Sequence, residues 1–200
     1  MQYLYKIWLY LRWPLAVLVV FYILLVLYRI PAVGEQQRTD AAVAKIHAEH
    51  ITLADVMGDA LPPVPNKDEN DATVAGIDKN NNGVRDDVEL AIFALHATSS
   101  KIRAAELQYA MDQQILLTEV FNSETWIAAA QQDSRGFACV GQTILDRNTQ
   151  LLDARLTEAK NLVLNTALRQ AAWHNAYSFT TSYSDLNEAE CDIDLNTLSN

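Results

Sequence analysis

An apolar run near the N-terminus sets the first limit on how this chain can fold. Residues 13–28, WPLAVLVVFYILLVLY, carry no charge and lie between Arg12 and Arg29. As a helix, these sixteen residues extend about 24 Å, and snorkelling of the two flanking arginines makes up the remainder of a hydrocarbon core about 30 Å thick. The run therefore predicts a single transmembrane helix that contacts the membrane through residues 13–28, with residues 1–30 as a membrane anchor.

Aromatic side chains around the start of the run suit a membrane interface. They are Tyr3, Tyr5, Trp8, Tyr10 and Trp13, and rings of these two types favour the level of the lipid headgroups.

A cleaved secretory signal is the alternative to an anchor. The triplet AVG at 32–34 has the small-x-small pattern of a cleavage site. The apolar run is longer than a signal usually carries, however, and Pro31 lies directly before the triplet, so we favour the uncleaved anchor. In both cases the C-terminal part lies outside the cytoplasm. We expect a single-pass protein of a bacterial inner membrane, with its C-terminal domain in the periplasm.

The remainder of the chain is strongly acidic. Residues 31–200 hold 12 basic and 25 acidic residues, a net charge of −13, because the first thirty residues contain three of the 15 basic residues and no acid. A surface of this charge repels phosphate backbones and anionic headgroups. We therefore expect no nucleic-acid partner, and a soluble body that stays off the membrane to which it is tied.

Two cysteines, Cys139 and Cys191, are the smallest set that can form a disulfide. Cys139 falls in a helical stretch, whereas Cys191 falls in an acidic tail with little pattern, SDLNEAECDIDLNTLSN. A bridge between them would fit an exported protein and would fasten the tail to the core. Two unrelated buried thiols are the alternative.

Residues 86–183 contain no proline and favour helix. Apolar residues recur every four positions at Leu107, Met111 and Ile115, and the sequence NSET that begins at position 122 should stop one helix and cap the next. Between 152 and 177 a further seam repeats at spacings of four and three. The predicted fold class is all-α: the transmembrane helix, then an extracytoplasmic bundle of about four helices.

The segment between anchor and bundle changes composition twice. Residues 38–57 are alanine-rich and favour one or two short helices, and the stretch ALPPVPNKDENDATVAG after them contains three prolines, which favour an extended linker. We therefore divide this part into a juxtamembrane helix and proline-containing linker at 31–71 and a folded domain at 72–200.

The most specific chemical pattern is DKNNNGVRDDVE at positions 78–89. It meets the pattern D-x-[DN]-x-[DN]-G-x5-E in full, in which short oxygen-bearing side chains alternate around a tight turn. Gly83 permits that turn because a Cβ would obstruct it. The predicted metal ligands are Asp78, Asn80, Asn82, the carbonyl of Val84, Asp86 through water, and Glu89 with both carboxylate oxygens.

These twelve positions resemble an EF-hand calcium loop, and the resemblance implies Ca²⁺ as the bound cofactor. It covers the loop and the helix that leaves it. The chain departs from the family in two ways: position 8 of the loop, usually apolar and paired with a partner loop, is Arg85, and Gly76 with the preceding prolines leaves no room for an entering helix. The stretch is therefore most similar to the solitary calcium loops of extracellular modules such as dockerins.

A metal-free turn that caps the next helix through Asp86 or Asp87 is the alternative to a calcium site. If the loop binds calcium, asparagine at positions 3 and 5 leaves only Asp78, Asp86 and Glu89 as charged ligands. Few charged ligands imply a dissociation constant of about 10⁻⁴ to 10⁻³ M, as in extracellular modules.

Other constellations are weaker. The sequence HAEH places His47 and His50 one helical turn apart but lacks the spacing of a zinc protease, and DIDLN from Asp192 has no glycine at its sixth position. We find no nucleophile elbow, phosphate-binding glycine loop or C-x-x-C pair. No catalytic residue is therefore assigned, and an enzyme is not expected.

Two functions fit these features. The first is a membrane-tethered, calcium-binding helical module that binds a protein partner outside the cytoplasm, as a secretion chaperone or assembly factor does. Its layout resembles that of membrane-bound lipase foldases, although their R-x-x-F-D-Y type signature is absent. The alternative is a calcium sensor in which loop occupancy rearranges the bundle. The missing partner loop argues against it, because cooperative opening normally uses two loops.

Overall fold

A computed structural model describes residues 2–200, except for the side chains of residues 2–5, 7, 9, 10, 31 and 147. Every regular element among the described residues is helical, so the predicted all-α class is confirmed. The chain forms two compact units, Met1–Ala41 and Ala42–Asn200. The boundary between them lies inside the segment 31–71 that we assigned to a juxtamembrane helix and linker.

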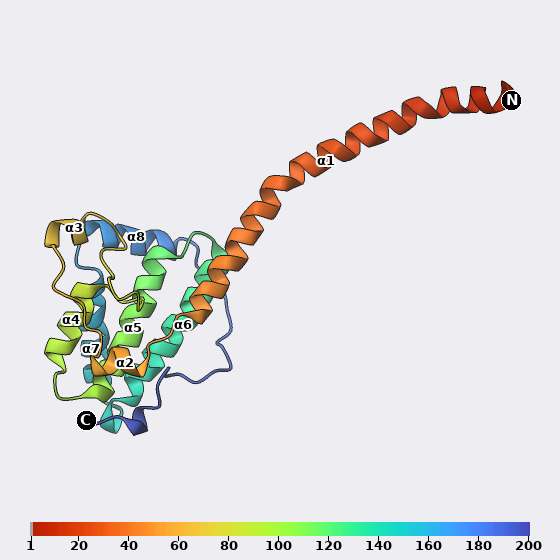
Figure 1. The fold of residues 1–200 in the computed structure, drawn as a ribbon. Helices are drawn as coiled ribbons and strands as arrows, with labels where there is room; N and C mark the ends of the chain where they lie inside the picture. The colour runs from red at the N-terminus through yellow and green to blue at the C-terminus, as the bar shows by residue number, and fades with distance from the viewer. Residues whose placement is uncertain (1) are drawn as a thin grey trace. The chain divides into compact units, whose positions relative to one another are not determined.

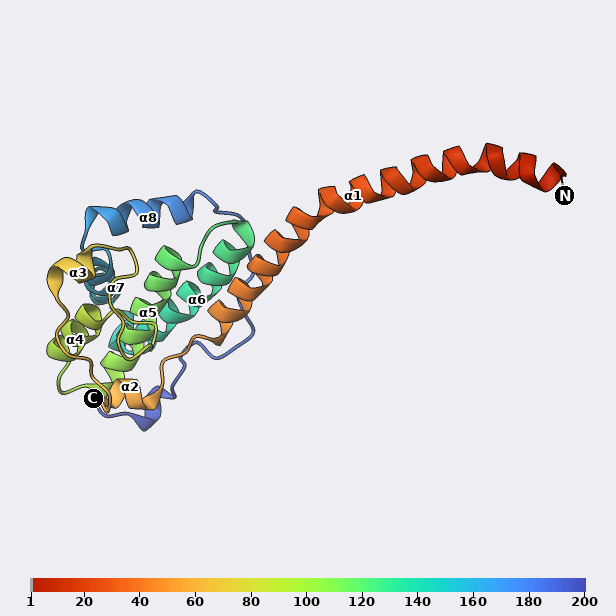
Figure 2. The same cartoon turned by 45° about the horizontal axis from the view of Figure 1, so that its top comes forward.

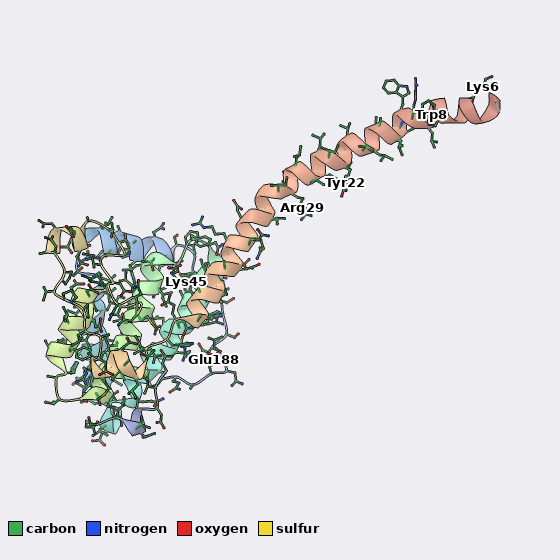
Figure 3. All side chains as sticks on the ribbon, viewed as in Figure 1. Lys6, Trp8, Tyr22, Arg29, Lys45 and Glu188 are labelled. Atoms are coloured by element: carbon green, nitrogen blue, oxygen red, sulfur yellow. A yellow bond between two sulfur atoms is a disulfide. The ribbon has the colours of Figure 1, made fainter. Side chains whose placement is uncertain are left out.

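The first unit consists of most of α1, a helix that runs from Gln2 to Ala48 (Figures 1 and 2). Among the described residues it is the one helix long and apolar enough to cross a membrane. The described side chains of the apolar run are exposed, and those of Trp8, Tyr22 and Arg29 stand out from the helix in Figure 3. The guanidinium of Arg12 lies 5.8 Å from the ring centres of both Trp8 and Trp13. Charged and aromatic side chains therefore meet near the start of the apolar run, as predicted for a membrane interface. Tyr3, Tyr5 and Tyr10 lie outside the described side chains.

The second unit is built around α5 (Ser100–Thr118), which packs against α2, α4, α6, α7 and α8 (Figures 1 and 2). The bounds of the other elements are α2 Leu53–Met57, α3 Lys67–Asp71, α4 Asp86–Leu95, α6 Ser123–Gln142, η1 Leu145–Arg147, α7 Thr149–Val163, α8 Ala167–Tyr177 and η2 Leu195–Thr197. Sixteen of the 19 residues of α5 are buried. The predicted seam of Leu107, Met111 and Ile115 lies in the core, and polar residues on the other faces of α5 are buried as well.

The predicted boundary at NSET is confirmed. Helix α5 ends at Thr118, and α6 begins at Ser123. Asn122 Oδ1 accepts a hydrogen bond from the Thr125 amide at 2.9 Å, while Thr125 Oγ1 accepts one from the Asn122 amide at 3.2 Å. This reciprocal capping box satisfies amides at the start of α6 that have no partner within the helix.

The predicted seam from 152 to 177 is interrupted. Helix α7 ends at Val163 and α8 begins at Ala167, with Thr166 as its N-cap. The break has a physical cause: Arg85 Nη2 and Nη1 donate hydrogen bonds to the carbonyls of Leu162 and Val163 at 2.9 and 3.1 Å. A guanidinium from another segment thus satisfies the last carbonyls of α7, and the chain is free to turn there.

A disulfide joins Cys139 of α6 to Cys191, 52 positions further along the chain. Part of the tail packs against the core, contrary to the little pattern that its sequence carries: Leu195 is buried, and Cys191, Ile193 and Leu198 are partly buried. Asp192 Oδ1 accepts a hydrogen bond from Arg135 Nη2 at 2.8 Å, and Asp192 Oδ2 accepts one from the Ile51 amide at 2.9 Å. The side chain of Asp192 therefore fastens the segment after α1 to α6.

Candidate metal site

Residues 78–85 of the loop lie between α3 and α4 and pass beside α5, and residues 86–89 form the first turn of α4 (Figures 1 and 2). Its backbone turns sharply, with left-handed residues at Asn81 (φ 57°) and Gly83 (φ 81°). A Cβ on Gly83 would lie 2.7 Å from Glu49 Oε2 and 3.1 Å from Met111 Cγ. Gly83 is thus needed both for the turn and for the close approach of its neighbours.

Hydrogen bonds draw the predicted ligands together around this turn. Asp78 accepts the amides of Asn82 (Oδ1, 3.3 Å) and Gly83 (Oδ2, 3.0 Å). Asn82 Oδ1 accepts the Val84 amide at 2.9 Å. In two further contacts, the Lys79 amide donates to Asp86 Oδ1 at 2.8 Å and Asn80 Nδ2 donates to Glu89 Oε2 at 3.0 Å. The loop is therefore a folded unit, in which side chains near its start meet side chains of the first turn of α4.

Several of these polar groups are buried without a partner. Asp86 and Glu89 are each 1% exposed, and Asp86 Oδ2 accepts no hydrogen bond. Asn80 Oδ1 and Asn82 Nδ2 are also buried and unpaired. A buried carboxylate oxygen without a partner is costly, and a hard cation takes oxygens of this kind as ligands.

The charge of the loop is uncompensated. Burial raises the pKa of Glu89 to about 7, opposed by the side chains of Asn80 and Asn82 and assisted by the charges of Asp55 and Asp86. Burial also raises the pKa of Asp78, and the charge of Asp86 adds to the effect. Among the salt bridges of the described residues, none joins Asp78, Asp86 or Glu89 to a basic side chain. A cation is the missing counter-charge that would favour the ionised carboxylates.

The donor set fits calcium in its chemistry, although it is not arranged around a single point. Within residues 2–200, no three His, Cys, Asp or Glu side chains converge closely enough to hold a metal ion by themselves. Half of the predicted ligands are of other kinds, namely Asn80, Asn82 and the Val84 carbonyl. Since Asn80 now turns its amide nitrogen toward Glu89, its side chain must rotate to offer oxygen to an ion.

The alternative in which a loop carboxylate caps α4 is not observed. The N-cap of α4 is Arg85, and it makes no side-chain capping bond. Asp86 accepts the Lys79 amide instead, and Asp87 forms an ion pair with Arg85, whose Nε lies 2.5 Å from Asp87 Oδ1. The carboxylates of the loop are therefore not used to begin the helix.

Residues outside the loop complete its surroundings, and no sequence pattern predicts them. Glu49, near the end of α1, lies against Gly83, and Asp55 of α2 acts on Glu89. Burial raises the pKa of Glu49, opposed by Lys45 and assisted by Glu119 and Asp78. A pocket of about 430 Å³ borders the loop here. Its lining includes Lys45, Glu49, Asp78, Gln114 and Glu119.

The two histidines of HAEH do not converge on a metal. His47 Nε2 lies 3.3 Å from Gln131 Oε1, whereas His50 Nδ1 lies 3.0 Å from Asp192 Oδ1. His96 is partly buried, with Nε2 2.8 Å from Glu106 Oε2. These histidines contact different parts of the second unit and form no joint site.

Comparisons with protein-family models, with curated proteins and with solved structures find no match for this chain. The fold and the loop therefore define its class: an all-α protein with one candidate membrane-spanning helix among the described residues and a disulfide-linked helical unit.

Proposed function

We propose that this chain is a membrane-anchored, calcium-binding helical protein that acts by binding and not by catalysis. The loop at 78–89 holds one Ca²⁺ ion with Asp78, Asn80, Asn82, Val84, Asp86 and Glu89, and the ion serves to hold the body in its folded form. The ion does so by supplying the counter-charge that the buried carboxylates lack. Each ligand comes from this chain, so no partner loop is needed.

One observation carries the proposal. The carboxylates of Asp86 and Glu89 are buried, no salt bridge among the described residues neutralises them, and Asp86 Oδ2 has no hydrogen-bond partner. Burying carboxylates in this manner costs stability unless a cation or a proton neutralises them. The spacing of the ligands supports the cation.

Calcium should raise the melting temperature of the detergent-solubilised chain. At a concentration ten times its dissociation constant, an ion that does not bind the unfolded chain stabilises the fold by RT ln 11, about 1.4 kcal/mol. For a body of this size, that raises the melting temperature by roughly 3 to 6 °C. Glu89→Gln should remove most of the shift, because it takes away one charged ligand and the bidentate contact together. Magnesium should substitute poorly, since it is too small for a seven-oxygen shell.

Asn81→Gly is the matched control for that measurement. Asn81 occupies position 4, which faces away from the ion, and glycine tolerates its left-handed backbone. This variant should keep the full calcium-dependent shift. Equal melting temperatures in millimolar calcium and in chelator would remove the structural role proposed for the ion.

We place the second unit in the periplasm, tied to a bacterial inner membrane by α1, where it binds a protein partner and acts as a secretion chaperone or assembly factor. The apolar segment of α1 and the net charge of −13 after residue 30 support a tethered acidic body. Purification of the solubilised protein with calcium and with chelator tests this role. A stoichiometric partner supports it, and a chain recovered alone in both conditions counts against it.

A calcium sensor is the second candidate, and the position of Arg85 favours it. In a paired EF-hand, position 8 contacts a partner loop. Here Arg85 is buried and contacts the end of α7 instead. The loop is thus connected to another part of the helical unit. A sensor requires such a connection, because calcium binding must change the structure outside the loop.

A further inference from the structure

We propose that Arg85 and Arg169 are positioning residues that couple occupancy of the calcium loop to the order of the α7–α8 junction, defined here as residues 162–170. The coupling rests on the calcium site proposed above and specifies how calcium binding at that site affects another part of the fold. It does not require a second calcium loop.

Arg85 connects the loop to the end of α7. Its side chain is buried, and Nη1 and Nη2 donate to the carbonyls of Val163 and Leu162 at 3.1 and 2.9 Å. Its Nε and Nη2 also donate to the two oxygens of Asp87, at 2.5 and 3.2 Å. The last carbonyls of a helix have no hydrogen-bond partner within it, so Arg85 of the loop supplies the donors that the end of α7 lacks.

Arg169 makes the opposite connection, from α8 to the segment that precedes the loop. It is fully buried, and Nε donates to the Val74 carbonyl at 3.2 Å. Nη1 lies 3.1 Å from Asp71 Oδ1, and Nη2 donates to the carbonyls of Asn70 and Thr73. Figures 1 and 2 both show α3 beside α8, as these contacts require.

Asn165 closes the network between the two arginines. Its Nδ2 donates to Asp87 Oδ2 at 3.1 Å, and its Oδ1 accepts from Arg169 Nη1 at 2.6 Å. The segment before the loop is joined to the loop by the backbone, because the Asp86 amide donates to the Ile77 carbonyl at 2.8 Å. The junction is therefore held from both ends of the calcium loop.

Burial makes this arrangement cooperative. A buried guanidinium that loses its acceptors becomes an uncompensated charge, so its contacts are made and lost together. If the ion favours the ordered loop, it also favours the ordered junction, and by linkage the ordered junction favours ion binding to the same degree.

Hydrogen–deuterium exchange of the full chain in detergent tests the coupling, with calcium binding measured in parallel by equilibrium dialysis. The reporters are the amides of Leu164 and Gln170, which donate to the carbonyls of Lys160 and Thr166 at 2.8 and 3.0 Å. Saturating calcium should slow their exchange by about ten-fold, the size of a typical coupling between sites.

Asn165→Ala should reduce the calcium effect on these amides to less than about three-fold while calcium still binds, with an affinity lowered by no more than the lost coupling factor. Arg85→Lys should act in the same direction, because lysine cannot reach both carbonyls and Asp87 at once. Asn161→Ala, an exposed change on α7 just before the junction, is the control and should keep the full effect. If Asn165 and Arg85 only stabilised the fold, their variants would change the exchange of these amides by the same factor with and without calcium.

The outcomes separate the two proposals. If calcium binds the wild type and exchange at the junction does not respond, the coupling is wrong and the calcium site stands. The coupling is also wrong if Asn165→Ala keeps the full ten-fold effect of calcium on exchange. Because this variant changes only one small side chain, it still tests the coupling if Arg85→Lys does not fold. If dialysis detects no calcium binding to the wild type, the proposed site fails and the coupling fails with it.

Discussion

Replacing Cys139 and Cys191 together by serine is expected to lower the free energy of unfolding by about 4 kcal/mol. The bridge closes a loop over 52 positions, and in the chain-entropy model a loop of that length restricts the unfolded chain by this amount. The loss should fall on the second unit, because Cys139 is 1% exposed within α6 and Asp192, next to Cys191, binds Arg135. Urea unfolding of the solubilised chain, followed by near-UV circular dichroism, measures the change.

The reducing agent supplies a control within the same experiment. Dithiothreitol should shift the unfolding midpoint of the wild type to that of the double variant, and it should leave the double variant unchanged. Alkylation of the unfolded, unreduced wild type should label neither cysteine. Quantitative labelling of both, or a midpoint that does not respond to reduction, would show that the bridge is absent from the protein in solution.

The largest qualitative effect is expected at the membrane. A reporter fused after Asn200 should be active outside the cytoplasm, and the chain should stay in the membrane fraction after carbonate washing, because residues 13–28 form an apolar segment of α1. Val20→Lys should weaken insertion by about 3 kcal/mol, since it places a charge near the middle of that segment. Release of a soluble chain with a new N-terminus near Glu35 would show that a signal peptide had been removed.

The sequence was sufficient for features that depend on neighbours along the chain. The helical class, the capping box at Asn122 and Thr125, and the tight turn at Gly83 all follow from local rules that the structure obeys. Each rests on backbone geometry or on hydrogen bonds within a few residues. The calcium site itself remains a prediction, because its donors are not arranged around a single point and its ion is inferred from their chemistry.

Features that depend on distant segments could not be predicted. Helical periodicity predicts one continuous apolar seam through 152–177. The chain instead turns at 164–166, because Arg85, almost eighty positions earlier, donates hydrogen bonds to the last carbonyls of α7. Likewise, Asp112 on α5 is fully buried, although a surface helix would expose it. Burial raises the pKa of Asp112 well above its usual value. Being surrounded by other helices is a tertiary property, which helical periodicity does not encode.

The account as a whole depends on whether the loop at 78–89 binds calcium. Equilibrium dialysis of the detergent-solubilised full chain against ⁴⁵Ca²⁺ measures this directly, with Glu89→Gln and Asn81→Gly in parallel. We predict one ion per chain with a dissociation constant of about 10⁻⁴ to 10⁻³ M for the wild type and for Asn81→Gly, and a loss of binding in Glu89→Gln. No saturable binding to the wild type at these concentrations, or equal binding to Glu89→Gln, would contradict the account.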